Sequence, residues 1–341
     1  MLHIGLDAHY RTSSYCILDH NGRKVKQETI RGDWRKVVAR LGRVREPFGI
    51  CFEASCGYGP LYDALSKMSR RVVMAHPGRL RLIFRSTRKN DRVDAEKLAK
   101  LLYLDEVPAS HVPSLDVRGW RELIEFRRGL VDKQTTCKNQ IRSLLRGYGI
   151  ASPRRLWSRK GLAWLLDQDW PTLSGRVRCE MLVQDYQANA RKIGTVTRVL
   201  DQMGAKHPGV ALLRTIPGVG ARTAETVMAY VDNPARFARP AQAASYFGLV
   251  PRQDSSAGVN RLGHITKQGP GTARKYLVQA AWQAVRRSPT VRRRYDRLLD
   301  GRRERRKVAL VAVAHWLVCC MQSMLSSGEV WRETVETAEA A

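Results

Sequence analysis

The sequence predicts a mixed α/β N-terminal domain, a long helical arm and a mostly α-helical C-terminal domain. Three observations predict this order: strand and helix patterns alternate at first, two long helical runs follow, and shorter helical runs separated by glycine turns complete the chain. We expect domains over residues 1–110, 111–205 and 206–330, and a flexible tail over 331–341. With 341 residues and 43% hydrophobic content, the chain can bury two cores.

The N-terminal domain is predicted to begin with three strands. Leu2 to Asp7 and Ser14 to Asp19 have strand patterns, and Asn21-Gly22 suits a tight hairpin that returns along Lys24 to Ile30. The elements that follow are a helix over Trp34 to Leu41, a strand over Phe48 to Glu53, a helix over Leu61 to Met68, a strand over Arg71 to Ala75, and a helix from Asp91. This order of strands and helices indicates a ribonuclease-H-like domain.

Four acidic residues lie where such a sheet would bring them together. Asp7 is on the first strand and Glu53 is at the carboxyl end of the fourth. Asp91 and Asp94, three residues apart, share one face of a helix. Carboxylate oxygens suit Mg²⁺, so all four are candidate metal ligands that would orient a phosphate. Alternatively, Asp91 and Asp94 are a solvated first turn stabilised by the helix dipole.

The charge predicts a polyanionic partner. Lys and Arg number 60 against 31 Asp and Glu, a net charge of +29, and neutralising phosphates drives sequence-independent nucleic-acid binding. The stretch 286–307 holds eleven basic residues against three acidic ones; the alternative is a solvated helix face. Candidate phosphate contacts in this stretch and beside the acidic helix are Arg88, Lys89, Arg292, Arg293, Arg302 and Arg303.

The long apolar run Val308 to Leu325 is predicted to be a buried helix. It contains His315 and Gln322 and follows a basic cluster, so we do not expect it to span a membrane. The seven cysteines are odd in number and lack paired metal-ligand spacing. We expect no signal peptide before Gly5. A reducing cytoplasm is the expected location.

Two long helices are predicted for the middle of the chain, over Leu115 to Gly147 and Leu173 to Met203, with a basic, aromatic connector over Pro153 to Trp170. The second has an expected apolar side that includes Val177 and Met181. Two amphipathic helices joined in this way suggest an antiparallel coiled-coil arm. The same stripe would serve either a dimer or an intramolecular hairpin.

The stretch Ile216-Pro217-Gly218-Val219-Gly220 precedes a predicted helix over Ala221 to Val231. An apolar-Pro-Gly-apolar-Gly turn between helices is typical of helix-hairpin-helix modules, in which the glycines let backbone N–H groups approach a phosphate. Gly218 and Gly220 are therefore candidate nucleic-acid contacts. The alternative is an ordinary helix C-cap turn without a ligand.

A polar segment with two serines follows, in the stretches 247–258 and 261–269. By composition it is a flexible basic loop. Enclosed by Arg252, Arg261 and Lys267, one of its hydroxyls could instead attack a phosphate while the cations stabilise the developing charge. Composition alone leaves both interpretations open.

The chain resembles the insertion-sequence "one-ten" family of transposases over nearly its whole length. The motifs that carry the resemblance are Gly5-Leu6-Asp7, Glu53-Ala54-Ser55, Lys89-Asn90-Asp91 with Asp94-Ala95, Ile216-Pro217-Gly218-Val219-Gly220, Gly248-Leu249-Val250-Pro251, and the later Ser-Ser and Ile-x-Lys-x-Gly. The resemblance implies a RuvC-like domain with an Asp-Glu-Asp-Asp set and a C-terminal domain with a nucleophilic serine. By position that serine is Ser256, five residues after Pro251, although Ser255 and Ala257 depart from the family pattern.

The resemblance also implies a mechanism and partners. In the family, the serine forms a covalent phosphoserine link to DNA, at a site composed from two protomers. A structured guide RNA, called a bridge RNA, pairs with donor and target DNA. We therefore expect a bacterial, nucleoid-associated homo-oligomer, a dimer or a tetramer in the synaptic complex. Two other functions compete: a metal-dependent Holliday-junction-resolvase-like nuclease without a covalent intermediate, and a non-catalytic nucleic-acid-binding protein.

Overall fold

The chain folds into two compact units, Met1–Leu115 and Asp116–Ala341. The computed structural model describes residues 1–54, 57–83, 90–256 and 259–333, with the backbone only at 254–256 and 259–260. The first unit ends five residues beyond the predicted boundary at 110. The second unit contains both the helical arm and the C-terminal elements, and their division into separate domains stays a prediction.

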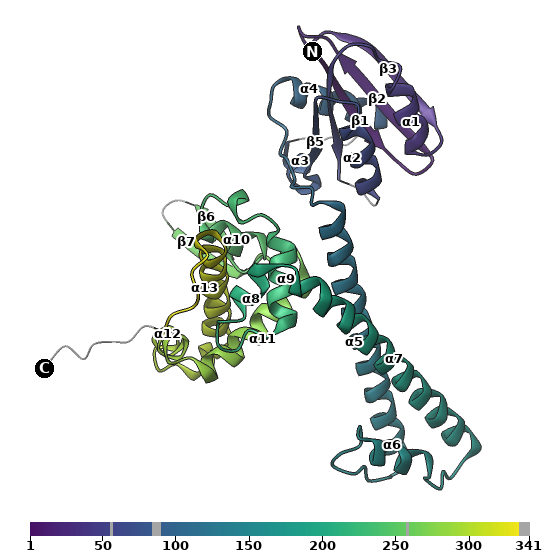
Figure 1. The fold of residues 1–341 in the computed structure, drawn as a ribbon, viewed down its shortest axis with the longest axis vertical. Helices are drawn as coiled ribbons and strands as arrows, with labels where there is room; N and C mark the ends of the chain where they lie inside the picture. Colours follow the sequence, from purple (N-terminus) through teal and green to yellow (C-terminus); the bar gives the residue numbers. More distant parts are fainter. Residues whose placement is uncertain (55–56, 84–89, 257–258, 334–341) are drawn as a thin grey trace, which may run out of the picture. The chain divides into compact units, whose positions relative to one another are not determined.

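A five-stranded mixed sheet forms the centre of the first unit (Figure 1). Its strands are β1 (Leu2–Ala8), β2 (Thr12–Leu18), β3 (Lys24–Arg31), β4 (Phe48–Glu53) and β5 (Arg71–Ala75). They lie in the order β3-β2-β1-β4-β5, with β1, β2 and β3 antiparallel and β1, β4 and β5 parallel. The mixed α/β architecture predicted for the N-terminal part is confirmed.

Helices cover both faces of this sheet. The helices α1 (Trp34–Leu41) and α2 (Tyr58–Ser66) pack over the apolar side chains of β1 and β4 that point to one face. The helices α3 (Pro77–Ile83) and α4 (Asp91–Tyr103) pack on the other face. The sequence prediction missed α3, whose seven residues are too few to establish a helical period.

Two antiparallel helices of 33 residues each, α5 (Leu115–Gly147) and α7 (Leu173–Ala205), form the arm, with α6 (Arg159–Leu166) at its tip (Figure 1). Arg127 Nε donates a hydrogen bond to Thr197 Oγ1 across the pair at 2.8 Å. The expectation that Val177 and Met181 lie on the apolar side of α7 is wrong, because their side chains are 40% and 63% exposed. Cys179 and Val183 are buried instead.

The C-terminal part is mostly helical, as predicted. Its elements are α8 (Pro208–Leu213), α9 (Ala221–Val231), η1 (Pro234–Arg236), α10 (Pro240–Tyr246), β6 (Pro251–Ser256), β7 (Val259–Ile265), α11 (Gly271–Arg287), α12 (Pro289–Leu299), η2 (Arg303–Arg305) and α13 (Arg306–Ser327). The expectation of a flexible basic loop is wrong for the described part of that segment. There β6 and β7 pair antiparallel, with Pro251 opposite Ile265 and Ser256 opposite Val259.

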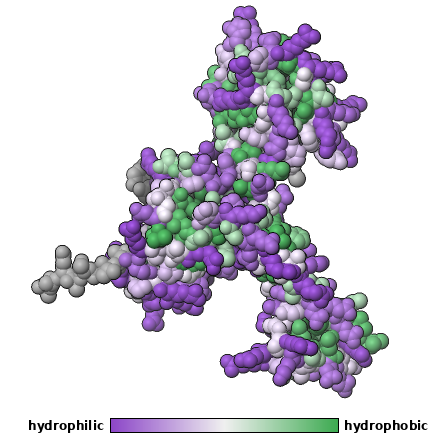
Figure 2. All heavy atoms as spheres, viewed as in Figure 1, coloured by the Kyte–Doolittle hydropathy of each residue, from purple (hydrophilic) through white to green (hydrophobic). Residues whose placement is uncertain are grey.

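The helix α13 is the centre of the C-terminal core. Residues Arg303–Ser327 are long and apolar enough to cross a membrane, yet half of the apolar window is buried against the rest of the protein. Val313, Ala314 and Leu317 have no exposed surface and belong to a core cluster shared with α10, α11 and α12. This packing agrees with the predicted buried helix. Polar side chains cover most of the visible face of the molecule (Figure 2).

Candidate metal and nucleic-acid sites

The two-residue period of the strands places Asp7 and Glu53 on one face of the sheet. In β1, Ile4 and Leu6 point into the core beneath α1 and α2, so Gly5 and Asp7 point to the opposite face. The parallel register pairs Leu6 with Phe52, so the next position of each strand brings Asp7 beside Glu53. The carboxylates therefore lie at the carboxyl ends of adjacent parallel strands, as expected from the sequence.

Gly5 allows α4 to lie directly on β1. A Cβ atom at Gly5 would stand 2.0 Å from the carbonyl oxygen of Ala95 and 2.3 Å from the amide nitrogen of Ala99. Ala95 and Ala99 are themselves completely buried and small. Backbone thus contacts backbone, and the close approach brings the first turn of α4 to the end of β1, next to Asp7.

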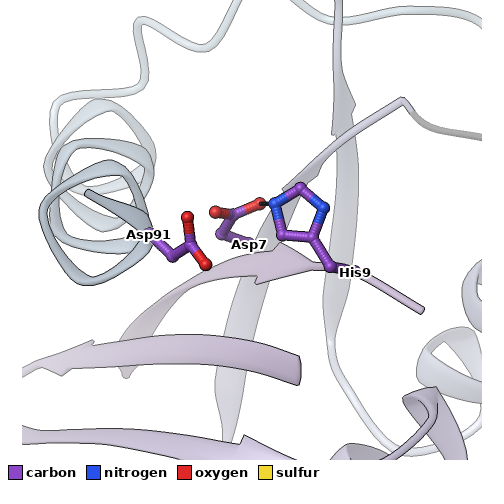
Figure 3. A group of neighbouring side chains, drawn as sticks. All are labelled: Asp7, His9 and Asp91. Atoms are coloured by element: carbon purple, nitrogen blue, oxygen red, sulfur yellow. Dashed lines mark ion pairs between the residues drawn. The ribbon is translucent and has the colours of Figure 1, made fainter. Parts of the chain in front are cut away.

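The first turn of α4 is fixed by hydrogen bonds at both its cap and its flank. The Asn90 side chain caps the helix by accepting a hydrogen bond from the Arg92 amide at 3.0 Å. Gln27 Nε2 on β3 donates to the Arg92 carbonyl oxygen at 2.7 Å. Both hydrogen bonds fix the backbone of Arg92, the residue after Asp91. Asp91 is the first helical residue, and its side chain points toward Asp7 (Figure 3).

Among the described residues, Asp7, His9 and Asp91 form a group that could hold a metal ion. One ligand atom from each lies within 4.8 Å of the others, and His9 Nε2 is 3.2 Å from Asp7 Oδ1 (Figure 3). Sequence reasoning missed His9. The sequence does contain an indication: His9 lies two residues after Asp7, and positions two apart on an extended chain point to the same face. Glu53 and Asp94 lie outside this three-residue group.

The other three predicted acids lie near enough to Asp7 for their charges to raise its pKa. Asp7 is 9% exposed, and burial raises the pKa of its carboxyl to about 6, partly offset by His9 and raised further by the charges of Asp91, Asp94 and Glu53. Asp94 also forms an ion pair with Lys97 at 3.3 Å. A buried carboxylate among like charges is a place where a bound cation would be stabilised. Arg88 and Lys89, the predicted phosphate contacts nearby, lie outside the described residues.

The predicted serines are the last two residues of β6. The backbone of Ser255 pairs with Asn260 and that of Ser256 with Val259. The predicted phosphate contacts Arg252, Arg261 and Lys267 on and beside this hairpin all have exposed side chains. Arg252 and Arg261 thus lie on the same hairpin as the serine backbone, and Lys267 lies two residues beyond its end.

The two glycines of the turn before α9 have different surroundings. A Cβ atom at Gly218 would stand 2.5 Å from the Ala284 amide nitrogen of α11, and its φ of 93° is left-handed. Gly218 is therefore explained by packing. Gly220 is exposed, has open space where a Cβ would lie, and immediately precedes α9. Phosphate contact at Gly220 stays a prediction.

The predicted contacts of the basic C-terminal stretch lie on α12 and beside η2. Arg292 pairs with Asp296 at 2.8 Å, and Arg302 pairs with Asp300 at 3.5 Å. Arg292, Arg302 and Arg303 are exposed, and Arg293 is half-buried. Exposed pairs of this kind stabilise a fold only slightly, so their side chains are available to a polyanion.

Two family profiles match the chain. One, described as "Transposase" and named for the DEDD domain of IS110, matches residues 4–150, which include all four acids. The other, described as "Transposase IS116/IS110/IS902 family", matches residues 210–296, which include the turn before α9 and the serine hairpin. Together they cover nearly all of the sheet, the whole of α5 and about two thirds of the C-terminal region.

Curated relatives are similar over most of the chain. The transposase for insertion sequence element IS1111A of Coxiella burnetii is 25% identical, covering 96% of this chain and 91% of the relative. The transposase for insertion sequence element IS1328 of Yersinia enterocolitica is 26% identical, covering 79% and 80%. A Sinorhizobium fredii protein named as a transposase, y4qE, is 27% identical over 73% of this chain, which spans 61% of that relative's length.

Proposed function

Because the chain belongs to the IS110 family of insertion-sequence transposases, we propose that it cuts DNA strands and transfers them through a serine-linked intermediate. The observation that carries the proposal is the meeting of Asp7, His9 and Asp91 at one end of the sheet, with Glu53 and Asp94 near enough for their charges to raise the pKa of Asp7. Like charges around a buried carboxylate disfavour its ionised form, so a cation bound among them would stabilise it. The set is suited to a divalent cation and a phosphate.

A divalent metal ion is the proposed cofactor, and Mg²⁺ is the proposed identity. Asp7 and Asp91 would hold it directly, with Glu53 and Asp94 adding negative charge, and the oxygen-rich donor set fits this ion. When bound, the ion supplies positive charge that orients a scissile phosphate and stabilises the leaving oxygen. The raised pKa of Asp7 supports the fit, because a cation favours the ionised carboxylate that the neighbouring acids oppose.

Ser256 is the proposed nucleophile, and Ser255 is the neighbouring alternative. In the proposed reaction the serine oxygen bonds to phosphorus while the bridging sugar oxygen leaves and takes up a proton. Arg252, Arg261 and Lys267 would stabilise the charge that develops on the phosphate oxygens. Support comes from the position of both serines on β6, in the segment that the family profile matches.

The proposed partners are donor and target DNA and a structured guide RNA. The net charge of +29 supports a polyanionic partner, and pairing with the RNA would supply sequence recognition. A homo-oligomer in the bacterial cytoplasm is proposed as the working form. The basic residues would then bind backbones, while the protein itself reads little sequence.

A denaturing gel with labelled element-end and target DNA tests the serine mechanism. We expect Ser256→Ala to abolish both the covalent protein–DNA adduct and recombination, because a methyl group cannot attack phosphorus. Ser255→Ala is the matched control and should retain part of both. Mass spectrometry of the adducted peptide locates the link. An adduct that disappears only in Ser255→Ala would move the nucleophile by one residue.

The same gel separates a recombinase from a simpler nuclease. Asp94→Asn should remove strand cleavage while leaving nucleic-acid binding intact, since it changes a site charge and not the basic surface. Metal-dependent cutting that never yields an adduct would contradict the serine mechanism and select the resolvase-like nuclease. If Asp94→Asn still cleaves strands at the wild-type level, Asp94 does not belong to the site.

A further inference from the structure

A cavity of about 830 Å³ lies between the β6–β7 hairpin and the helices α12 and α13. Its wall is apolar: Leu249 and Val311 line it, and the Trp316 indole belongs to it. Apolar side chains are visible over this region of the C-terminal part (Figure 2). The volume is within the range of sites that enclose organic ligands. The acidic site does not use this cavity, and of its lining only Lys267 has a proposed role in the serine mechanism.

The mouth of the cavity is positively charged. Lys267, Arg294, Arg305 and Lys307 line it, and all four have exposed side chains. Among the described lining residues none is acidic. An occupant that combines an apolar, flat part with an anionic part matches this distribution. A nucleotide has both parts, a base and a phosphate.

An aromatic ring and a guanidinium group line the cavity, and both can stack on a nucleobase. The Arg294 guanidinium lies over the Trp316 ring, 4.7 Å from its centroid. Both groups stack on nucleobases without sequence preference in proteins that bind single strands. Trp316 is half-buried and packs against Trp331 edge to face, so its ring is held in place.

The hairpin side of the cavity is built rigidly. Arg274 Nη1 donates hydrogen bonds to the carbonyl oxygens of Phe247 at 3.0 Å and Gln268 at 2.7 Å, which fixes the segment after β7. Lys267 within that segment has a φ of 55°, a left-handed conformation that is uncommon for lysine. The hydrogen bonds of Arg274 therefore fix the segment that contains Lys267, which has a backbone conformation that glycine would adopt more easily.

We propose that this cavity receives an unstacked nucleotide of the DNA strand, with its base against Trp316 and its phosphates on the basic mouth. The proposal rests on the proposed function, because DNA is the expected substrate. DNA is favoured as the source since Pro251, which lines the cavity, and Ser256 lie on the same strand β6. Five residues of strand span about 17 Å, so the captured base would lie several nucleotides from the reacting phosphate.

Binding of the full chain to short strands tests the proposal. The probes are a thymidine oligonucleotide, the same backbone with abasic sugars in place of nucleosides, a uridine RNA of equal length, and a DNA duplex. We expect the wild type to prefer the thymidine strand to the abasic strand by roughly tenfold, the scale of one base-stacking contact. The two strands carry equal charge, so the difference measures the bases alone.

Leu262→Glu and Val308→Glu place a carboxylate in the cavity wall. These side chains are 69% and 62% exposed, so the fold tolerates the change. Met181→Glu is the matched control, because Met181 on α7 is 63% exposed and outside the cavity. We expect both cavity variants to bind the thymidine and abasic strands equally, whereas the control keeps the preference.

The proposal would be overturned by a wild type that does not distinguish the two DNA strands, by cavity variants that still distinguish them, or by a preference confined to the RNA. A cavity variant that changes only the oligomeric mass would also overturn it, because the surface would then be a protein contact. The affinity for duplex DNA separates a failure of the cavity proposal from a failure of the proposed function. If duplex DNA binds and the wild type shows no base preference, the cavity proposal alone fails. If neither duplex nor single strands bind, the proposed function fails.

Discussion

His9 changes the expected metal preference of the candidate site. Its imidazole nitrogen lies 3.2 Å from Asp7 and shares a potential ligand group with Asp91. Nitrogen donors suit Mn²⁺ better than Mg²⁺, which prefers oxygen. A site of two carboxylates and one imidazole should therefore accept Mn²⁺ readily.

Metal-induced thermal stabilisation measures this preference. We expect Asp7→Asn to remove the rise in Tm produced by either ion, because ligand binding to the folded state is what raises Tm. His9→Ala should reduce the stabilisation by Mn²⁺ more than that by Mg²⁺. Asp105→Asn, an exposed carboxylate in the same unit, is the control. Equal losses for both ions in His9→Ala would show that the imidazole is not a ligand.

Glu225 on α9 couples stability to pH. Its side chain is almost completely buried, and burial raises the pKa of this carboxyl to about 7, only partly offset by Arg222 and Arg127. Arg222 Nη1 lies 3.3 Å from the carboxylate but makes no hydrogen bond. In the unfolded chain the group titrates near 4.5. The folded state therefore binds more protons between these two pH values.

The unfolding free energy should accordingly fall as pH rises from about 4.5 to about 7, by at most about 3 kcal/mol. We expect Glu225→Gln, which cannot ionise, to lack this contribution. The difference in stability between Glu225→Gln and the wild type should be small at pH 5 and favour the variant at pH 8. Urea unfolding at both pH values measures it. A difference independent of pH would contradict the raised pKa.

The contact between α4 and β1 is the element on which the acidic site depends. We expect Gly5→Ala to destabilise the first unit by roughly 1–3 kcal/mol, because a Cβ would collide with the backbone of α4. Gly129→Ala on α5 is the control, since the space there is open and alanine favours a helix. Thermal unfolding measures both. A Gly5→Ala variant as stable as the control would show that α4 can shift without cost.

The turn before α9 offers a similar comparison. Gly218→Ala should destabilise the C-terminal part, because both the left-handed φ and the Ala284 backbone exclude a side chain. Gly220→Ala should fold normally, and if its amide approaches a phosphate, it should bind DNA several-fold more weakly. Melting temperature and DNA affinity are measured for each variant. Unchanged affinity in Gly220→Ala would leave the turn with a packing role alone.

Sequence periodicity predicted the elements that are long or bordered by clear turns. The bounds of α5 and α9 agree with the prediction, because each has a sustained apolar stripe. The hairpin of β6 and β7 was missed, since its mostly polar residues lack the alternation of apolar and polar positions that identifies a strand. The exposure of Val177 and Met181 was also missed, because periodicity identifies the apolar positions of a helix but not which of them another element covers.

The strand and helix positions of the candidate acids could be predicted from the sequence, and the geometry of the site could not. Asp7, Glu53, Asp91 and Asp94 follow from strand ends and helical spacing. The inclusion of His9 and the looser placement of Glu53 and Asp94 depend on how closely α4 approaches β1. That distance is set by three small residues, Gly5, Ala95 and Ala99, which carry no chemistry of their own.

For the whole molecule, the net charge of +29 predicts steep salt dependence. Affinity for DNA or RNA should fall linearly on logarithmic axes as salt rises, because each neutralised phosphate releases counterions. Six or more contacts would weaken binding by about 10³ or more between 50 and 200 mM salt. Filter binding over that range measures the slope. A flat response would contradict phosphate contact as the basis of binding.

The equal lengths of α5 and α7 set the reach of the arm. A helix of 33 residues is about 50 Å long, the axial length of roughly 15 base pairs of duplex. The arm is thus longer than one turn of DNA. Removing seven residues from each helix, about two helical turns, would shorten it by about 10 Å.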